Sequence, residues 1–83
     1  MTGVRIIREL PLSKTGAQQV LVRQGSDYYV VSSMVMPITG AETLVFRSNS
    51  GGKITEWNEV AGGRGMSREE AIADLADRPE NEA

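Results

Sequence analysis

The 83-residue sequence contains neither cysteine nor histidine. Without cysteine the chain forms no disulfide, and no thiolate is available to bind zinc or to act as a nucleophile. The absence of histidine removes the commonest general base and the commonest transition-metal ligand, and it excludes a Ser-His-Asp triad. We therefore expect a protein that is not an enzyme and that binds no cofactor and no metal.

Long apolar runs are also absent. Arg5 and Arg8 interrupt the apolar residues near the start of the sequence, so no signal-peptide core is recognisable there. No stretch approaches the roughly 20 apolar residues of a membrane-spanning helix. These two absences predict a cytoplasmic protein without a membrane partner.

A chain of this length is typical of one domain. We expect residues 1–78 to form it and residues 79–83 to be a polar, flexible tail. The net charge is −2, but residues 1–50 have five basic and three acidic side chains, whereas residues 51–83 have four basic and eight acidic ones. The basic residues are scattered along the chain, which is typical of a solvated surface and makes nucleic acid the less favoured partner.

Apolar and polar residues alternate in five segments, which predicts β-strands. The expected strands are residues 3–10, 17–24, 28–36, 42–47 and 53–58. The first should place Val4, Ile6 and Leu10 on one face, and the third is apolar on both faces, so we expect it at the centre of the sheet. Short links between strands favour an antiparallel meander over βαβ crossovers.

The last element is a predicted helix of about ten residues. Ser67 and Glu70 have the spacing of a capping box, and Glu69 and Glu70 suit the positive end of the helix dipole. Pro79 should end the helix. One narrow apolar stripe is expected to pack on the sheet: Ala71, Ile72, Leu75 and Ala76. The predicted fold is thus α+β, an antiparallel meander of about five strands with one short C-terminal helix on it.

This helix is too narrow to cover the whole apolar surface of five strands. The rest of the sheet must curl on itself or be covered by a partner. We therefore expect a protein partner, and a homodimer is one possibility.

The stretch S-N-S-G-G-K, residues 48–53, resembles a phosphate-binding loop at first sight. In that motif a glycine would stand at Arg47 and a serine or threonine at Ile54, so the motif is not met. The glycines instead predict a hairpin turn between segments 42–47 and 53–58. Trp57 is expected to anchor the core, with a role in an interface as the alternative.

The stretch G-G-R-G-M-S, residues 62–67, precedes the predicted helix. Free N–H groups at a helix start can bind an anion, although Glu69 and Glu70 would oppose it. The candidate anion-binding residues are Gly63, Arg64, Gly65 and Ser67. The interpretation that we favour for this stretch is a flexible connector. A nucleic-acid or anion-binding module would use the scattered arginines Arg5, Arg23, Arg47 and Arg64.

The acidic residues of the second half favour a solvated face that could complement a basic partner surface. Paired carboxylates can also hydrolyse glycosides, but that chemistry needs a cleft that a chain this short hardly encloses. The predicted partner-binding residues are Trp57, Glu59, Arg64, Glu69, Glu70 and Asp74.

Two segments have a familiar pattern: T-L-V-F-R-S-N-S-G-G-K-I-T-E-W-N-E at residues 43–59 and S-R-E-E-A-I-A-D-L at residues 67–75. The pattern resembles small orphan accessory proteins of bacteriophages and mobile elements, among which are the anti-CRISPR proteins. This resemblance implies an accessory protein, and inhibitors of host defence complexes belong to this class. It assigns no functional residue.

Overall fold

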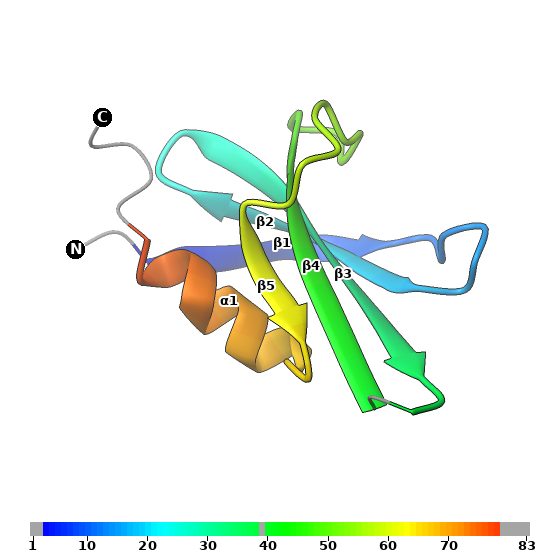
Figure 1. The fold of residues 1–83 in the computed structure, drawn as a ribbon. Helices are drawn as coiled ribbons and strands as arrows, with labels where there is room; N and C mark the ends of the chain where they lie inside the picture. Colours follow the sequence, from blue (N-terminus) through cyan, green and yellow to red (C-terminus); the bar gives the residue numbers. More distant parts are fainter. Residues whose placement is uncertain (1–2, 39, 79–83) are drawn as a thin grey trace.

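The computed structural model describes residues 3–38 and 40–78. Five strands are followed by one helix (Figure 1). The elements are β1 (Val4–Leu10), β2 (Gln18–Gln24), β3 (Asp27–Met36), β4 (Gly40–Ser48), β5 (Ala61–Arg64) and α1 (Arg68–Ala76). The strands lie side by side in chain order, and each is antiparallel to its neighbour. The predicted α+β meander is therefore confirmed, with β3 at its centre.

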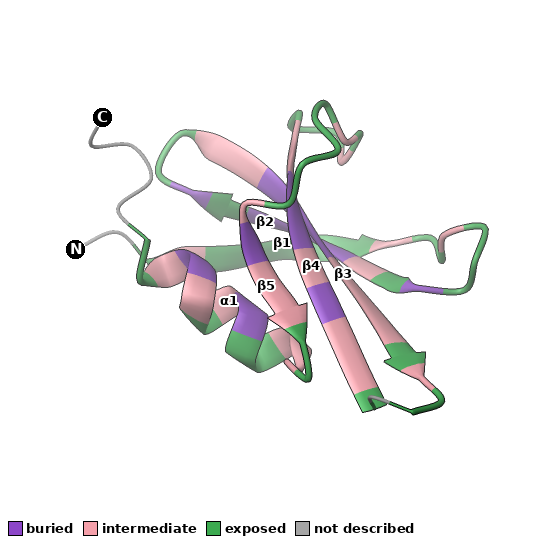
Figure 2. Ribbon diagram, viewed as in Figure 1, coloured by how far each residue is buried: buried purple, intermediate pink, exposed green. Residues whose placement is uncertain are grey.

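The helix covers one face of the sheet (Figure 2). The core between them consists of Val20, Val22, Tyr29, Val31, Val45, Ala61, Ala71 and Leu75. Alternate residues of β2, β3 and β4 point to this layer, as the period of a strand requires. The side-chain amide of Gln24 donates to the carbonyl of Leu75 (3.3 Å), which attaches the end of the helix to β2.

The predicted capping box is present. The Glu70 N–H donates to Ser67 Oγ (3.2 Å), and the Ser67 N–H donates to Glu70 Oε1 (2.8 Å). The helix ends at Ala76. Pro79, which we expected to end it, and the predicted tail 79–83 lie outside the described residues.

The fifth strand is not where the sequence placed it. Residues 53–58 form only an isolated bridge, between Ser48 and Ile54, and β5 lies in the glycine-rich stretch that we interpreted as a connector. Gly62 makes this pairing possible. At its φ of +90° a Cβ atom would overlap the carbonyl oxygen of Thr43, so only glycine lets β5 approach β4 so closely.

A β-bulge divides β1. Ile6 pairs with Val22 and Arg8 with Leu21, so Ile7 is an extra residue on β1. After the bulge the alternation is reversed, and Leu10 points to the face opposite Ile6. The prediction that Leu10 shares the face of Val4 and Ile6 is therefore wrong.

Candidate functional site

The second face of the sheet, away from the helix, carries its own buried residues. Leu21 and Val30 are fully buried, and Phe46 is only 8% exposed. The segment 49–60, which we call the flap, folds back over this face. Leu10, turned to this side by the bulge, packs beside Gly52 of the flap. A second, smaller apolar layer results, and the rest of this face stays open.

The flap begins with a tight turn. Asn49 Oδ1 accepts hydrogen bonds from the N–H groups of Gly51 (2.9 Å) and Lys53 (3.0 Å), and the Asn49 carbonyl accepts one from Gly52 (3.0 Å). Arg8 Nη2 donates to the Gly51 carbonyl (3.0 Å) from β1. A turn lies where the sequence predicted one, but it does not join two strands, because residues 53–58 form only the isolated Ser48–Ile54 bridge. Its amide groups bind within the turn and do not form a phosphate-binding loop.

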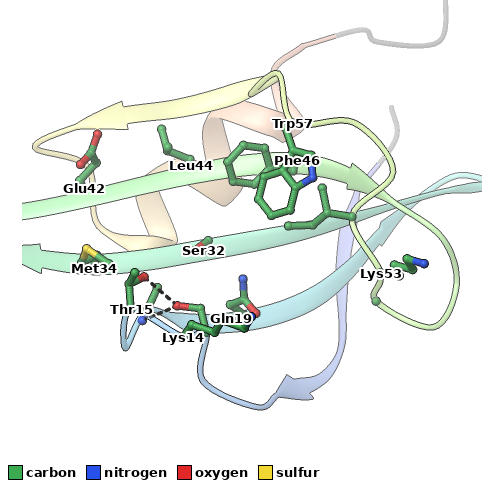
Figure 3. A pocket seen from close by; sticks show the side chains of 14 residues that line it. Lys14, Thr15, Gln19, Ser32, Met34, Glu42, Leu44, Phe46, Lys53 and Trp57 are labelled. Atoms are coloured by element: carbon green, nitrogen blue, oxygen red, sulfur yellow. Dashed lines mark hydrogen bonds between the residues drawn. The ribbon is translucent and has the colours of Figure 1, made fainter.

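Trp57 stands on the flap at the edge of the open area (Figure 3). Its ring centroid lies 5.4 Å from that of Phe46 with the planes tilted by 58°, yet the residue is 72% exposed. The prediction that Trp57 anchors the core is therefore wrong. The reason is that residues 53–58 do not continue as a strand, so their alternation does not align with the core of the sheet.

A cleft of about 680 Å³ lies below Trp57, between the flap and the loop that joins β1 to β2. Its apolar lining comes from β3, β4 and the flap (Figure 3): Met34, Leu44, Phe46, Ile54 and Trp57. Its polar lining includes Lys14, Thr15, Gln19, Ser32, Glu42 and Lys53. The cleft is open to solvent, so it can receive a side chain or an extended segment from outside.

The charges around the cleft are separated. Lys53 lies on the flap, Lys14 lies on the loop between β1 and β2, and Glu42 lies at the other end of the floor (Figure 3). Within the described residues, no ion pair involves these three side chains. The loop that carries Lys14 is ordered by the Ala17 N–H, which donates to Ser13 Oγ (2.9 Å). The cleft thus offers two cationic groups and one anionic group to a ligand.

Across residues 3–38 and 40–78, no three histidine, cysteine, aspartate or glutamate side chains come close enough to hold a metal ion. In the same part of the chain, the helix is too short and too polar to cross a membrane.

Of the six predicted partner-binding residues, only Trp57 lines the cleft. Glu59 is exposed elsewhere on the flap, Arg64 ends β5, and Glu69 and Glu70 lie at the start of the helix. The structure therefore does not bring these residues together into one site.

Asp74 has an internal role. Its Oδ2 accepts a hydrogen bond from the Gly62 N–H (2.9 Å) and one from Arg78 Nη2 (3.1 Å). The Gly62 hydrogen bond, helped by Arg78, holds the pKa of Asp74 below its ordinary value, although partial burial opposes this shift. The expectation that Asp74 faces water is corrected: it joins the helix to β5.

The candidate anion site at residues 63–67 lies where β5 leads into the helix. The Ser67 N–H donates to the Glu70 carboxylate, so this donor is already engaged by an anionic side chain of the same helix.

Met34 and Leu44, which form the cleft floor, were missed as site residues. The sequence shows that both residues alternate with neighbours that face the helix. Which part of the face away from the helix stays open follows only from the fold of the flap.

Comparison of this chain with protein-family models, with curated proteins and with solved structures gives no match. The resemblance to accessory proteins of bacteriophages therefore stays a prediction.

Proposed function

We propose that this chain is a non-enzymatic protein-binding module whose cleft receives an extended segment of a partner protein. The observation that carries the proposal is Trp57, which is 72% exposed at the wall of an apolar cleft. Tryptophan is the residue type most often found to dominate binding energy in protein interfaces.

The free energy available at Trp57 is substantial. A tryptophan side chain presents about 200 Å² of surface, and apolar burial contributes about 25 cal/mol per Å². Covering the exposed part of this one residue would therefore contribute on the order of 3 kcal/mol. The apolar floor of Met34 and Leu44 adds to this term, while the ordering of the partner segment opposes it.

The charges define the chemistry of the segment. An apolar side chain would enter the cleft between Trp57 and Met34. A carboxylate next to it in the partner's sequence would meet Lys53 on the flap or Lys14 on the opposite loop, and a basic residue farther along would meet Glu42. The proposed occupant is therefore an extended segment with an apolar anchor and an acidic neighbour.

A protein of this kind acts by occupying a segment of its partner. The resemblance to phage accessory proteins supports the narrower proposal of an inhibitor of a host complex. The cleft itself supports only the binding step, and the two proposals can fail separately.

The test is a selection of random peptides displayed on phage against the immobilised chain. Two variants of neighbouring residues on β3 serve as probes, because Met34 lies in the cleft and Val35 points to the other face. Peptides with an apolar residue beside aspartate or glutamate should be enriched. They should bind Val35→Glu like the wild type and Met34→Glu at least about tenfold more weakly, since a carboxylate would be buried there.

Lack of enrichment, or equal binding to the two variants, would overturn the proposal. Sedimentation velocity examines the other occupant, a second copy of the chain. A dimer that Met34→Glu dissociates and Val35→Glu does not would overturn the peptide segment in favour of self-association.

A further inference from the structure

Two arginines meet on the face of the sheet opposite the helix. Arg5 and Arg23 are direct partners in the register of β1 and β2, and both are exposed. Directly opposed side chains of antiparallel strands point to the same face, with Cβ atoms about 5 Å apart. Arg23 follows the inward-facing Val22, so this face is the one away from the helix. Two positive charges are thus held side by side.

Among the described residues, no acidic side chain forms an ion pair with either arginine. Within the described residues, the ion pairs are Arg47 with Glu56 and Arg78 with Asp74, and neither includes Arg5 or Arg23. Like charges directly opposite each other destabilise a pair of strands. An anion between the two guanidinium groups would remove this conflict.

The space for such an anion is present. A hollow of about 300 Å³ is lined by Arg5, Arg23 and the glycines Gly3 and Gly25. The two glycines have no side chains, so the only side chains that line this hollow are those of the two arginines. A phosphate group fits within this volume.

Arg23 is already oriented. Its Nε donates to the Gly25 carbonyl (2.7 Å), and its guanidinium carbon lies 5.7 Å from the ring centroid of Tyr28. These contacts engage Nε and one face of the guanidinium group, and they leave the two terminal nitrogens to donate. Holding the side chain in advance lowers the entropy cost of binding.

We propose that Arg5 and Arg23 bind a phosphate group, and that they prefer the dianion of a phosphate monoester. Each guanidinium can donate two parallel hydrogen bonds to phosphate oxygens, and two positive charges match a dianion better than the single charge of a diester. The monoester could belong to a small metabolite or to a phosphorylated side chain. The site is separate from the cleft, because the two have no lining residue in common.

The test is an NMR titration of the isotope-labelled chain with inorganic phosphate at constant ionic strength. The Arg23 Nε–H and the Gly25 amide should shift in a saturable way. Arg5→Gln and Arg23→Gln should each weaken binding at least about tenfold, the effect of removing a charge-assisted hydrogen-bond donor. Arg64→Gln, an exposed arginine on β5, is the matched control and should bind like the wild type.

A phosphomonoester peptide and a short oligothymidine distinguish the sources. The peptide should bind at least as well as inorganic phosphate. Oligothymidine that binds more tightly, and loses this affinity in Arg5→Gln, would overturn the monoester preference. Equal phosphate shifts in all variants would overturn the site itself.

A second measurement uses the sign of the change in melting temperature to distinguish a phosphate-binding role of Arg5 from a merely structural one. In dilute chloride buffer, Arg5→Gln should melt at a higher temperature than the wild type, because it removes the repulsion from Arg23. Phosphate should raise the melting temperature of the wild type more than that of Arg5→Gln. A lower melting temperature for Arg5→Gln in chloride would contradict the proposal.

Discussion

Replacing Gly62 by alanine tests the close approach of β5 to β4. Gly62 has a φ of +90°, which costs an L-residue roughly 1–2 kcal/mol. The new Cβ would also overlap the Thr43 carbonyl oxygen and lie 3.1 Å from the Leu44 Cα, and both are backbone atoms that cannot rotate away. Forcing packed elements apart costs roughly a further 1–3 kcal/mol. We therefore expect a loss of roughly 2–5 kcal/mol.

Gly65→Ala is the matched control. Gly65 has a φ of +78°, and a Cβ there would meet no atom within 4 Å, so it reports the backbone strain without the overlap. Urea unfolding followed by far-UV circular dichroism gives the free energy of unfolding of both variants. A domain of this size has a total stability of about 4–12 kcal/mol, so Gly62→Ala could be partly unfolded in water. If the two variants lose the same free energy, the account of β5 is refuted.

Two further predictions concern Asp74 and Trp57. Because the folded-state pKa of Asp74 lies below the ordinary value of 3.8, its stabilisation is complete above about pH 4 and is lost as the pH falls through the lowered pKa. In urea unfolding at pH 7, Asp74→Asn should lower the free energy of unfolding by about 1–2 kcal/mol, and Asp77→Asn should leave it almost unchanged. A loss for Asp74→Asn that is as large at pH 2 as at pH 7 would contradict this role. In thermal or urea unfolding, Trp57→Ala should lower the free energy of unfolding by at most about 1.5 kcal/mol, the contribution of an aromatic pair. A loss of about 3–5 kcal/mol would instead show that Trp57 is a core residue.

The sheet and the helix could be predicted because their signals are local. Alternating apolar residues define β2, β3 and most of β4, and the Ser67–Glu70 spacing defines the start of the helix. These signals depend on a few neighbouring side chains and on the period of the backbone. These local signals are sufficient to predict that the helix packs on one face of the sheet.

The fifth strand could not be predicted because its determinants are distant in the sequence. Ala61–Arg64 has two glycines and no alternating pattern, and it is a strand because Gly62 fits against Thr43 and donates to Asp74. Glycine has a low preference for strands, so tertiary contacts outweigh the local preference here. The segment 53–58 has the better alternating pattern, but it does not pair with β4 as a strand.

The cleft was missed for a related reason. The alternation in residues 42–47 places Leu44 and Phe46 on one face, but the flap covers part of that face and leaves the rest open. The bulge at Ile7, which turns Leu10 toward the flap, has no signature in the alternation itself. Trp57 was therefore assigned to the core, although its position on a folded-back loop leaves it at the edge of the cleft.

The most direct test of the proposed function is iodide quenching of the fluorescence of Trp57, the only tryptophan. We predict that quenching in the free chain approaches that of free tryptophan, and that a saturating amount of the selected peptide reduces it severalfold. With Met34→Glu at the same peptide concentration, quenching should stay high. Strong protection of Trp57 in the free chain, or quenching that saturating peptide leaves unchanged, would contradict the account.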